Sequence, residues 1–269
     1  MDNRAIGVFD SGLGGLTAVR RLREALPGED VVYLGDTGRV PYGGRSRETI
    51  MQYAREDFAF LMGFDIKAIV VACGTVSTVA LPEMAGDYAL PVVGVVEPAA
   101  KKAAELTKNG RIGLIATRAS VSSGAYEREI ARIAPDKQVF SQACPLFVPL
   151  VENGRVAPGD VVIETVAREY LAPLREKDID TLILGCTHYP IIRDVIADIM
   201  GPGVALIDTG GEAAAELAAI LRARDALSAG TREGTCRCFV TDSVEGFNES
   251  AGRFLGGGVI NETQRVSLN

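Results

Sequence analysis

Short apolar segments rich in valine and isoleucine alternate along the chain with segments of helical periodicity. We predict that these apolar segments are buried strands, at residues 5–9, 30–34, 68–72, 92–95, 112–116, 181–184 and 205–207. Residues 16–26 and 47–62 carry apolar side chains at spacings of three and four, which predicts two surface helices. Buried strands that alternate with helices are typical of parallel sheets, so the pattern predicts an α/β fold.

The same order of segments occurs twice, which indicates an internal repeat. Each half has a first strand, a long insertion, a second strand that ends near a cysteine and a threonine, a helix and a third strand. Cys73 and Cys186 occupy matching places in the two halves. Ligands of open parallel sheets bind beyond the carboxyl ends of the strands, so two facing halves would point both thiols into one cleft.

We therefore predict two similar parallel-sheet α/β domains related by pseudo-symmetry, with the active site in the cleft between them. The first domain is expected to be discontinuous and to comprise residues 1–97 and 209–269. The second is expected to comprise residues 98–208.

Charge and hydropathy exclude several classes of partner. A formal net charge of −7 and a pI near 5.0 argue against binding to nucleic acid or to an anionic membrane. No apolar run approaches the roughly 18 residues of a membrane span, and the amino terminus lacks the pattern of a signal peptide. These features predict a cytoplasmic enzyme or small-molecule-binding protein.

Five cysteines in a chain without an export signal are expected to be reduced thiols. The Cys236 and Cys238 pair is interpreted as structural, because no second Cys/His pair accompanies it. Cys73 and Cys186 are each expected at the amino terminus of a helix, and the helix after Cys186 is expected to start near Pro190. The positive end of a helix dipole lowers the pKa of a nearby thiol. A single buried cysteine is usually a small apolar residue, but two in matching contexts call for a chemical role.

Polar side chains accompany both cysteines. Asp10 and Ser11 follow the first strand in a glycine-rich segment. This segment matches neither the G-x-G-x-x-G nor the Gly-Lys-Ser/Thr phosphate-binding motif. It is interpreted either as an ordinary capped turn or as a site for a small ligand. His188, the only histidine, lies two residues after Cys186 and can exchange protons near neutral pH. A metal site at Cys186 and His188 would need two further ligands, and the sequence has none nearby, so no metal site is predicted. Glu152 by itself is typical of a solvated loop carboxylate.

Several blocks in chain order resemble glutamate racemase. They are VFDSGLGG at residues 8–15, GDT at 35–37, PYG at 41–43, AC-x-T at 72–75, SGAY at 123–126, CPLFVPLVENG at 144–154, LGCTHYP at 184–190 and IDTG at 207–210. The resemblance extends over nearly the whole chain, and the GCTHYP block is the most specific.

The resemblance implies a cofactor-independent enzyme that interconverts L- and D-glutamate and supplies D-glutamate for peptidoglycan synthesis. It assigns proton transfer to Cys73 and Cys186, and supporting roles to Asp10, Glu152 and His188. It also implies substrate contacts. The residues implied to contact the substrate are Asp10, Ser11, Tyr42, Gly43, Gly74, Thr75, Thr187 and His188. A homodimer is compatible with the resemblance, although the sequence does not determine the oligomeric state.

Gly74 departs from the family pattern, which usually has asparagine after the first catalytic cysteine. The missing amide removes a hydrogen bond to the substrate, worth about 1.5 to 3 kcal/mol if the partner is charged. Val76 and Thr78 replace smaller residues and suggest local repacking. Two alternatives therefore stay open: a racemase or isomerase of the same superfamily for aspartate or another small amino acid, and a non-catalytic amino-acid-binding relative.

Overall fold

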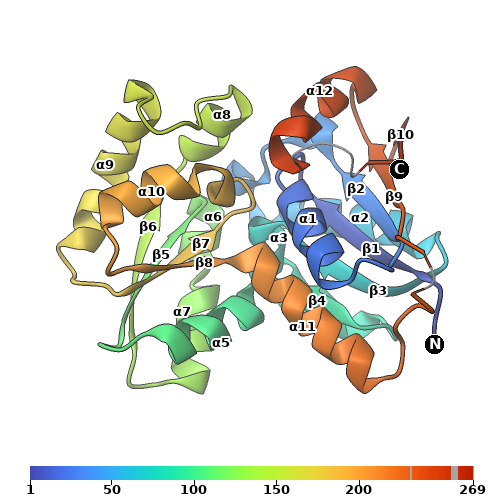
Figure 1. Ribbon diagram of the computed structural model, residues 1–269, viewed down its shortest axis with the longest axis horizontal. Helices are drawn as coiled ribbons and strands as arrows, with labels where there is room; N and C mark the ends of the chain where they lie inside the picture. The colour runs from blue at the N-terminus through green and yellow to red at the C-terminus, as the bar shows by residue number, and fades with distance from the viewer. Residues whose placement is uncertain (231, 256–259, 269) are drawn as a thin grey trace.

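The computed structural model of the chain describes residues 1–230, 232–255 and 260–268. Its strands form two parallel sheets, which lie in two α/β domains side by side (Figure 1). The first sheet has the order β10-β9-β2-β1-β3-β4, and the second has the order β6-β5-β7-β8. The strands are β1 (Ala5–Asp10), β2 (Val31–Gly35), β3 (Ile66–Val71), β4 (Val92–Gly94), β5 (Arg111–Ala116), β6 (Gln138–Ala143), β7 (Thr181–Gly185), β8 (Ala205–Asp208), β9 (Cys236–Val240) and β10 (Glu262–Arg265).

The predicted repeat is confirmed by the strand order. Within the first sheet β2-β1-β3-β4 has the same order as β6-β5-β7-β8 in the second, so β3 and β7 are equivalent strands. In both sheets the first strand of the half pairs in parallel with the strand that precedes a site cysteine: Phe9 pairs with Val71, and Ala116 pairs with Gly185. Cys73 and Cys186 thus follow equivalent strands.

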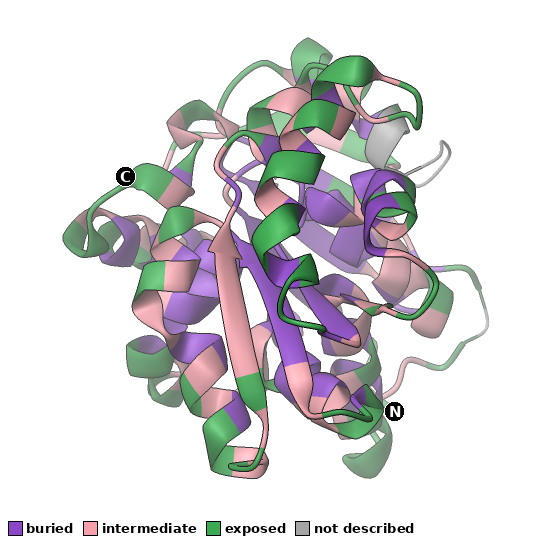
Figure 2. Cartoon of the chain, turned by 90° about the vertical axis from the view of Figure 1, so that its left-hand side faces the viewer, coloured by how far each residue is buried: buried purple, intermediate pink, exposed green. Residues whose placement is uncertain are grey.

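All seven predicted strands are present, but three further strands were not predicted. The predicted strands are apolar because most of them are covered on both faces by helices. β6 and β10 lie at sheet edges. β6 is half-buried (Figure 2), and β10 is largely exposed. Edge positions tolerate polar side chains, so β6 and β10 lack a continuous apolar run. β9 lies between β10 and β2, and exposed Arg237 interrupts its apolar run.

Helices cover both faces of the sheets. Those with more than six residues are α1 (Leu16–Ala25), α2 (Arg47–Met62), α5 (Val96–Leu106), α7 (Ala125–Ile133), α9 (Val161–Arg175), α10 (Arg193–Met200), α11 (Thr209–Ala223) and α12 (Val244–Leu255). Shorter helices and turns lie near the strand ends: α3 (Gly74–Val79), α4 (Leu81–Met84), α6 (Arg118–Ser123), α8 (Phe147–Glu152), and the 3₁₀ turns η1 (Thr37–Arg39), η2 (Tyr42–Gly44), η3 (Ala85–Asp87) and η4 (Tyr189–Ile192). The two predicted surface helices correspond to α1 and α2.

The chain crosses between the sheets twice. It passes from β4 through α5 to β5, and it returns from β8 through α11, which packs against α1. Asp208 caps α11 by accepting hydrogen bonds from the N–H groups of Gly210 and Gly211, and its Oδ2 lies 2.8 Å from Arg21 Nε on α1. These crossings support our proposal that the domain boundaries lie at residues 97/98 and 208/209.

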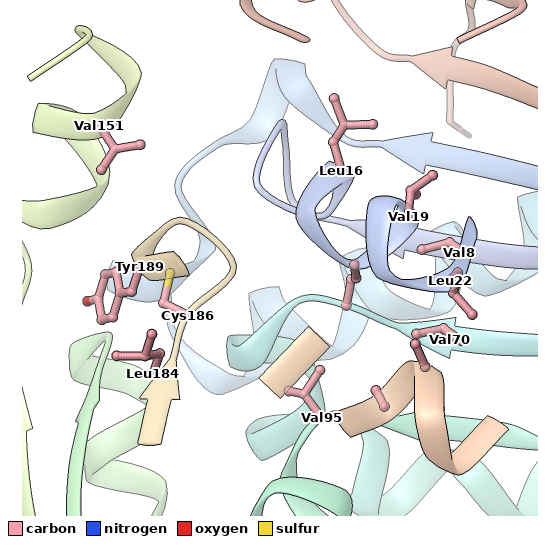
Figure 3. Packing of buried hydrophobic residues seen from close by; sticks show 14 of the residues in the cluster. Val8, Leu16, Val19, Leu22, Val70, Val95, Val151, Leu184, Cys186 and Tyr189 are labelled. Atoms are coloured by element: carbon pink, nitrogen blue, oxygen red, sulfur yellow. The ribbon is translucent and has the colours of Figure 1, made fainter. Parts of the chain in front are cut away.

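Buried apolar side chains fill the space between sheets and helices (Figure 3). In the first half, Val8 and Val70 from the sheet belong to the same buried cluster as Leu16 and Val19 from α1. In the second half, Cys186 lies close to Leu184 and Tyr189 in the same view (Figure 3). Among the described helices, none is long and apolar enough to cross a membrane.

Candidate active site

A cavity of about 560 Å³ opens between the two domains at the carboxyl ends of their strands. Every residue predicted for the site lines it, and both domains contribute. These residues are Asp10, Ser11, Tyr42, Gly43, Cys73, Gly74, Thr75, Glu152, Cys186, Thr187 and His188. The tertiary structure therefore brings together segments separated by as much as 178 positions in the sequence, from Asp10 to His188.

Cys73 lies in the first domain, just after β3 and at the start of the six-residue helix α3. Its Sγ is 3.6 Å from Ser11 Oγ. Burial, followed by the nearby carboxyl group of Asp10, raises the pKa of Cys73 to about 12. The expectation that the helix dipole lowers this pKa is therefore wrong for the free protein, because desolvation of the thiolate outweighs one short helix end.

Asp10 ends β1 and is almost completely buried. Its Oδ2 accepts hydrogen bonds from the N–H groups of Gly12 (3.1 Å) and Gly15 (2.9 Å), so Asp10 does cap the glycine-rich turn. Its Oδ1 is buried without a hydrogen-bond partner among the described residues. Burial raises the pKa of Asp10 against the opposing effects of His188 and these N–H donors. The capped-turn interpretation is thus confirmed by the structure, and the small-ligand interpretation stays a prediction.

Cys186 lies in the second domain and follows β7 directly. Its Sγ is 3.9 Å from His188 Nδ1, and His188 Nε2 is 3.0 Å from Glu152 Oε1. Burial alone would lower the pKa of His188, but its interactions with Cys186 and Glu152 outweigh burial and raise the pKa to about 10. The imidazole is therefore protonated at neutral pH and lies between a thiol and a carboxylate.

Two expectations about this half are corrected by the structure. Glu152 is not merely a solvated loop carboxylate, because it ends α8 and bonds His188. The chain after Cys186 does not enter an α-helix near Pro190. It forms the 3₁₀ turn η4, and α10 begins only at Arg193. The positive charge near this thiol therefore comes from a side chain rather than from a helix end.

Aromatic packing fixes the position of Glu152. Phe147 on α8 makes an edge-to-face contact with Tyr189 on η4, with ring centroids 5.2 Å apart. The Tyr189 hydroxyl donates to the backbone carbonyl of Cys144 at 3.0 Å. Both contacts hold the segment before Glu152 against the turn that carries His188. Cys144 itself is completely buried and also lines the cavity.

Thr117 is a cavity residue that the sequence analysis missed. Its Oγ1 lies 3.1 Å from Oγ1 of Thr75, so two hydroxyls meet across the cleft from opposite domains. Thr117 follows β5 as Ser11 follows β1, and β5 and β1 are equivalent strands. The internal repeat therefore contained the signal that could have identified it. Arg118, next in the chain, also lines the cavity.

Two glycines allow the domains to approach closely at the cavity. A Cβ on Gly74 would lie 2.6 Å from the backbone oxygen of Gly185. A Cβ on Gly14 would lie 2.2 Å from Thr187 Oγ1 and 2.6 Å from His188 Nδ1. Such distances are too short for real carbon contacts. A side chain at Gly74 would require the backbone at Gly185 to move, and one at Gly14 would require the side chains of Thr187 and His188 to move.

The site is built from thiols, hydroxyls, carboxyls and one imidazole. Within the described ranges, no group of three or more His, Cys, Asp or Glu side chains is arranged to hold a metal ion. The chemistry that this set supports is proton transfer: an acid–base thiol in each domain, with a carboxyl group near one and an imidazolium near the other.

Comparison with known proteins gives consistent similarities. Residues 14–218 match the family described as Asp/Glu/Hydantoin racemase. A glutamate racemase of Geobacter metallireducens is 46% identical over 265 residues, which cover 98% of this chain and 97% of that protein. The crystal structure of a glutamate racemase isoform from Bacillus anthracis is 37% identical with a TM-score of 0.95, covering 100% of this chain and 99% of that one. The structure of the Francisella tularensis glutamate racemase in complex with D-glutamate is 40% identical with a TM-score of 0.92, at the same coverage.

Proposed function

Because the chain belongs to the Asp/Glu/hydantoin racemase family, we propose that it interconverts L- and D-glutamate by proton transfer between two thiols. The observation that carries this proposal is the placement of Cys73 and Cys186 after equivalent strands of two domains, lining one cavity. Racemisation needs a base on one face of Cα and an acid on the other, and two facing domains supply one group for each face.

In the proposed reaction, one cysteine thiolate removes the Cα proton and the opposite thiol returns a proton to the other face of the planar carbanion. The two cysteines exchange these roles when the reaction runs in the opposite direction. One proton leaves Cα and one returns to it, so no proton is gained or lost overall. By family resemblance, Cys73 takes the proton from D-glutamate and Cys186 takes it from L-glutamate.

The electrostatics of the free protein support a defined starting state. The imidazolium of His188, 3.9 Å from Cys186 Sγ, can stabilise a thiolate there. Burial keeps Cys73 in the neutral thiol form at physiological pH. This pattern suits entry of L-glutamate, with Cys186 as base and Cys73 as acid. Entry of D-glutamate requires the proton to move to the other thiol first.

Polar groups of the cavity suit an amino acid with two carboxylates. The hydroxyls of Ser11, Thr75, Thr117 and Thr187 can donate hydrogen bonds to carboxylate oxygens, and the buried Asp10 Oδ1 can accept one from the substrate ammonium group. Donors directed at a carboxylate also stabilise the charge that develops when the Cα proton leaves. The reaction then needs no cofactor.

We extend the proposal to the biological role that the resemblance implies. The D-glutamate produced would supply peptidoglycan synthesis, and the enzyme would work in the cytoplasm, where that precursor is assembled.

Solvent deuterium uptake at Cα, measured for a panel of amino acids by mass spectrometry, tests the proposal. We expect exchange and inversion of both glutamate enantiomers, with little exchange of aspartate. Faster exchange of aspartate or another amino acid would favour a different racemase of the superfamily. Binding of glutamate without any exchange would instead indicate a non-catalytic relative.

A further inference from the structure

Asp57 is a completely buried carboxyl group that the proposed reaction does not use. It lies on α2 and has no exposed surface. Its Oδ2 is 3.1 Å from the hydroxyl oxygen of Tyr42, which belongs to the η2 turn that lines the cavity. Its Oδ1 is buried without a hydrogen-bond partner among the described residues. A buried ionised carboxylate with so few donors would be strongly destabilising.

The Tyr42 hydroxyl contacts two carboxyl groups but carries one proton. It forms its shorter hydrogen bond with Asp36 Oδ2 and the 3.1 Å contact with Asp57. Burial raises the pKa of Tyr42, so the hydroxyl keeps its proton. If Tyr42 donates to Asp36, the contact with Asp57 is a hydrogen bond only when Asp57 is protonated and donates to the hydroxyl oxygen.

Asp36 has more hydrogen-bond donors than Asp57. Asp36 also accepts hydrogen bonds from Arg39 Nε at 2.5 Å and from Thr241 Oγ1 at 2.8 Å. Arg39 Nη2 is 3.6 Å from Asp57 Oδ1, which is close enough for an ion pair but beyond hydrogen-bond distance. The other nearby charge, Glu56, is negative and also pairs with Arg39. One half-buried arginine thus faces three carboxyl groups, and protonation of Asp57 removes the least compensated charge.

This chain of hydrogen bonds ends at a turn that must be placed accurately. A Cβ on Gly43, next to Tyr42, would lie 2.8 Å from Thr117 Cβ of the other domain. The Tyr42 side chain is buried and its hydroxyl is occupied by Asp36 and Asp57. The turn therefore depends on the carboxyl groups beneath it for its position in the cavity wall.

We propose that Asp57 is a positioning residue, which stays protonated and donates to Tyr42 so that the η2 turn keeps its place in the cavity wall. The part of this inference that concerns substrate affinity rests on the proposed function. The part that concerns protonation does not. Asp36, Arg39, Tyr42 and Glu56 are the charged or titratable groups that act on Asp57.

Infrared spectroscopy of the intact protein tests the protonation directly. At neutral pH, the spectrum of the wild-type protein minus that of Asp57→Asn should contain the carbonyl stretching band of one carboxylic acid. The subtraction cancels the contribution of Asp10, which is present in both proteins. A difference spectrum with only carboxylate bands would overturn the proposal, and this result does not depend on any enzymatic activity.

Kinetics test the positioning role. Asn at position 57 also donates to Tyr42, so Asp57→Asn should keep KM for both glutamate enantiomers within about twofold. Asp57→Ala removes the donor and should raise KM by about three- to tenfold, with kcat changed less. In a Tyr42→Phe background, Asp57→Ala should have no further effect on KM, because the acceptor is already absent.

The results of these experiments distinguish a failure of the Asp57 proposal from a failure of the proposed function. An Asp57→Asn protein with a strongly raised KM would show that an ionised carboxylate is needed and would overturn the proposal, even if Asp57→Ala fails to fold. Wild-type KM in Asp57→Ala would also overturn it. A wild-type protein that does not racemise glutamate would contradict the proposed function, while the infrared result would still decide the protonation of Asp57.

Discussion

Nε2 of His188 lies 3.0 Å from Oε1 of Glu152, although the two residues are 36 positions apart in the sequence. Interactions with Cys186 and with Glu152 together outweigh burial and raise the pKa of His188 to about 10, and Nδ1 of the same ring lies 3.9 Å from Cys186 Sγ. The positive charge beside Cys186 therefore depends in part on a carboxyl group that bonds the far side of the imidazole ring.

Replacing Glu152 by Gln should shift the pH dependence of activity. Without the carboxylate, the pKa of His188 falls from about 10, so the imidazolium is lost at lower pH. The alkaline limb of the kcat/KM profile for L-glutamate should move down by about 1 to 3 pH units. Glu152→Asp, which keeps the charge, is the control. An alkaline limb that stays in place in Glu152→Gln would show that this pair does not control the active protonation state.

Cys73→Ala and Cys186→Ala should each abolish racemisation with the fold retained. Each removes the proton carrier of one face, which corresponds to a loss of about 10²- to 10⁴-fold or more in kcat. Circular dichroism should show cooperative melting of both proteins. Cys144→Ala is the matched control, because Cys144 is also a buried thiol lining the cavity and should be dispensable. Near wild-type racemisation in both directions by either of the first two variants would contradict the two-thiol assignment.

Asp10→Asn and His188→Asn should impair the two reaction directions unequally. Asp10 lies near Cys73, whereas His188 contacts Cys186, so each variant disturbs one thiol more than the other. The ratio of kcat/KM values is fixed by the overall equilibrium, so the asymmetry must be sought in kcat and in primary isotope effects for each enantiomer. Equal changes in both directions for both variants would show that neither residue serves one particular thiol.

Gly74→Asn should lower activity rather than restore a family contact. The new Cβ would lie 2.6 Å from the backbone oxygen of Gly185 in the other domain, and backbone cannot move aside easily. Overpacking of this kind costs about 1 to 3 kcal/mol, so kcat/KM for glutamate should fall by about 5- to 150-fold. Gly74→Ala has the same Cβ without the amide and should show a similar loss. A lower KM for glutamate in Gly74→Asn alone would instead mean that the amide fits and binds substrate.

Asp57→Asn should change the pH dependence of stability. Burial raises the pKa of Asp57, so above about pH 4 the folded protein holds a proton that the unfolded chain has released. Asp57 therefore makes the free energy of unfolding of the wild-type protein fall as the pH rises, until the pH exceeds the pKa of Asp57 in the folded protein. The stability of the variant relative to wild type should rise by about 1.4 kcal/mol per pH unit in this range, in denaturant unfolding.

Exposed Asp198 provides the control for that measurement. Asp198→Asn makes the same charge change on the surface of α10, and its stability should follow the wild-type pH dependence. If the Asp57→Asn and wild-type curves also run parallel, Asp57 is ionised in the folded protein.

Local patterns in the sequence were sufficient to predict the α/β class, the repeat and most central strands. Burial on both faces makes strands such as β1 and β7 continuously apolar, and the 3.6-residue period made α2 recognisable over its full length. The motifs also identified eleven of the residues that line the cavity, but not Thr117. Several of the eleven follow parallel strands, whose carboxyl ends meet at one sheet edge. Their catalytic roles stay predictions. The edge strands β6 and β10 were missed, since half-exposed strands need no apolar run.

Tertiary structure alone decided the electrostatics of the site. The pKa of Cys73 is raised because the folded chain removes water from the thiol and places the Asp10 carboxyl group nearby, effects that no local pattern encodes. The pairing of His188 with Glu152 depends on the packing of Phe147 against Tyr189, and the tight approach of Gly74 to Gly185 depends on how two domains meet. Sequence periodicity reports which side chains are buried. Distances and desolvation between segments far apart in the chain arise only when the domains have packed together.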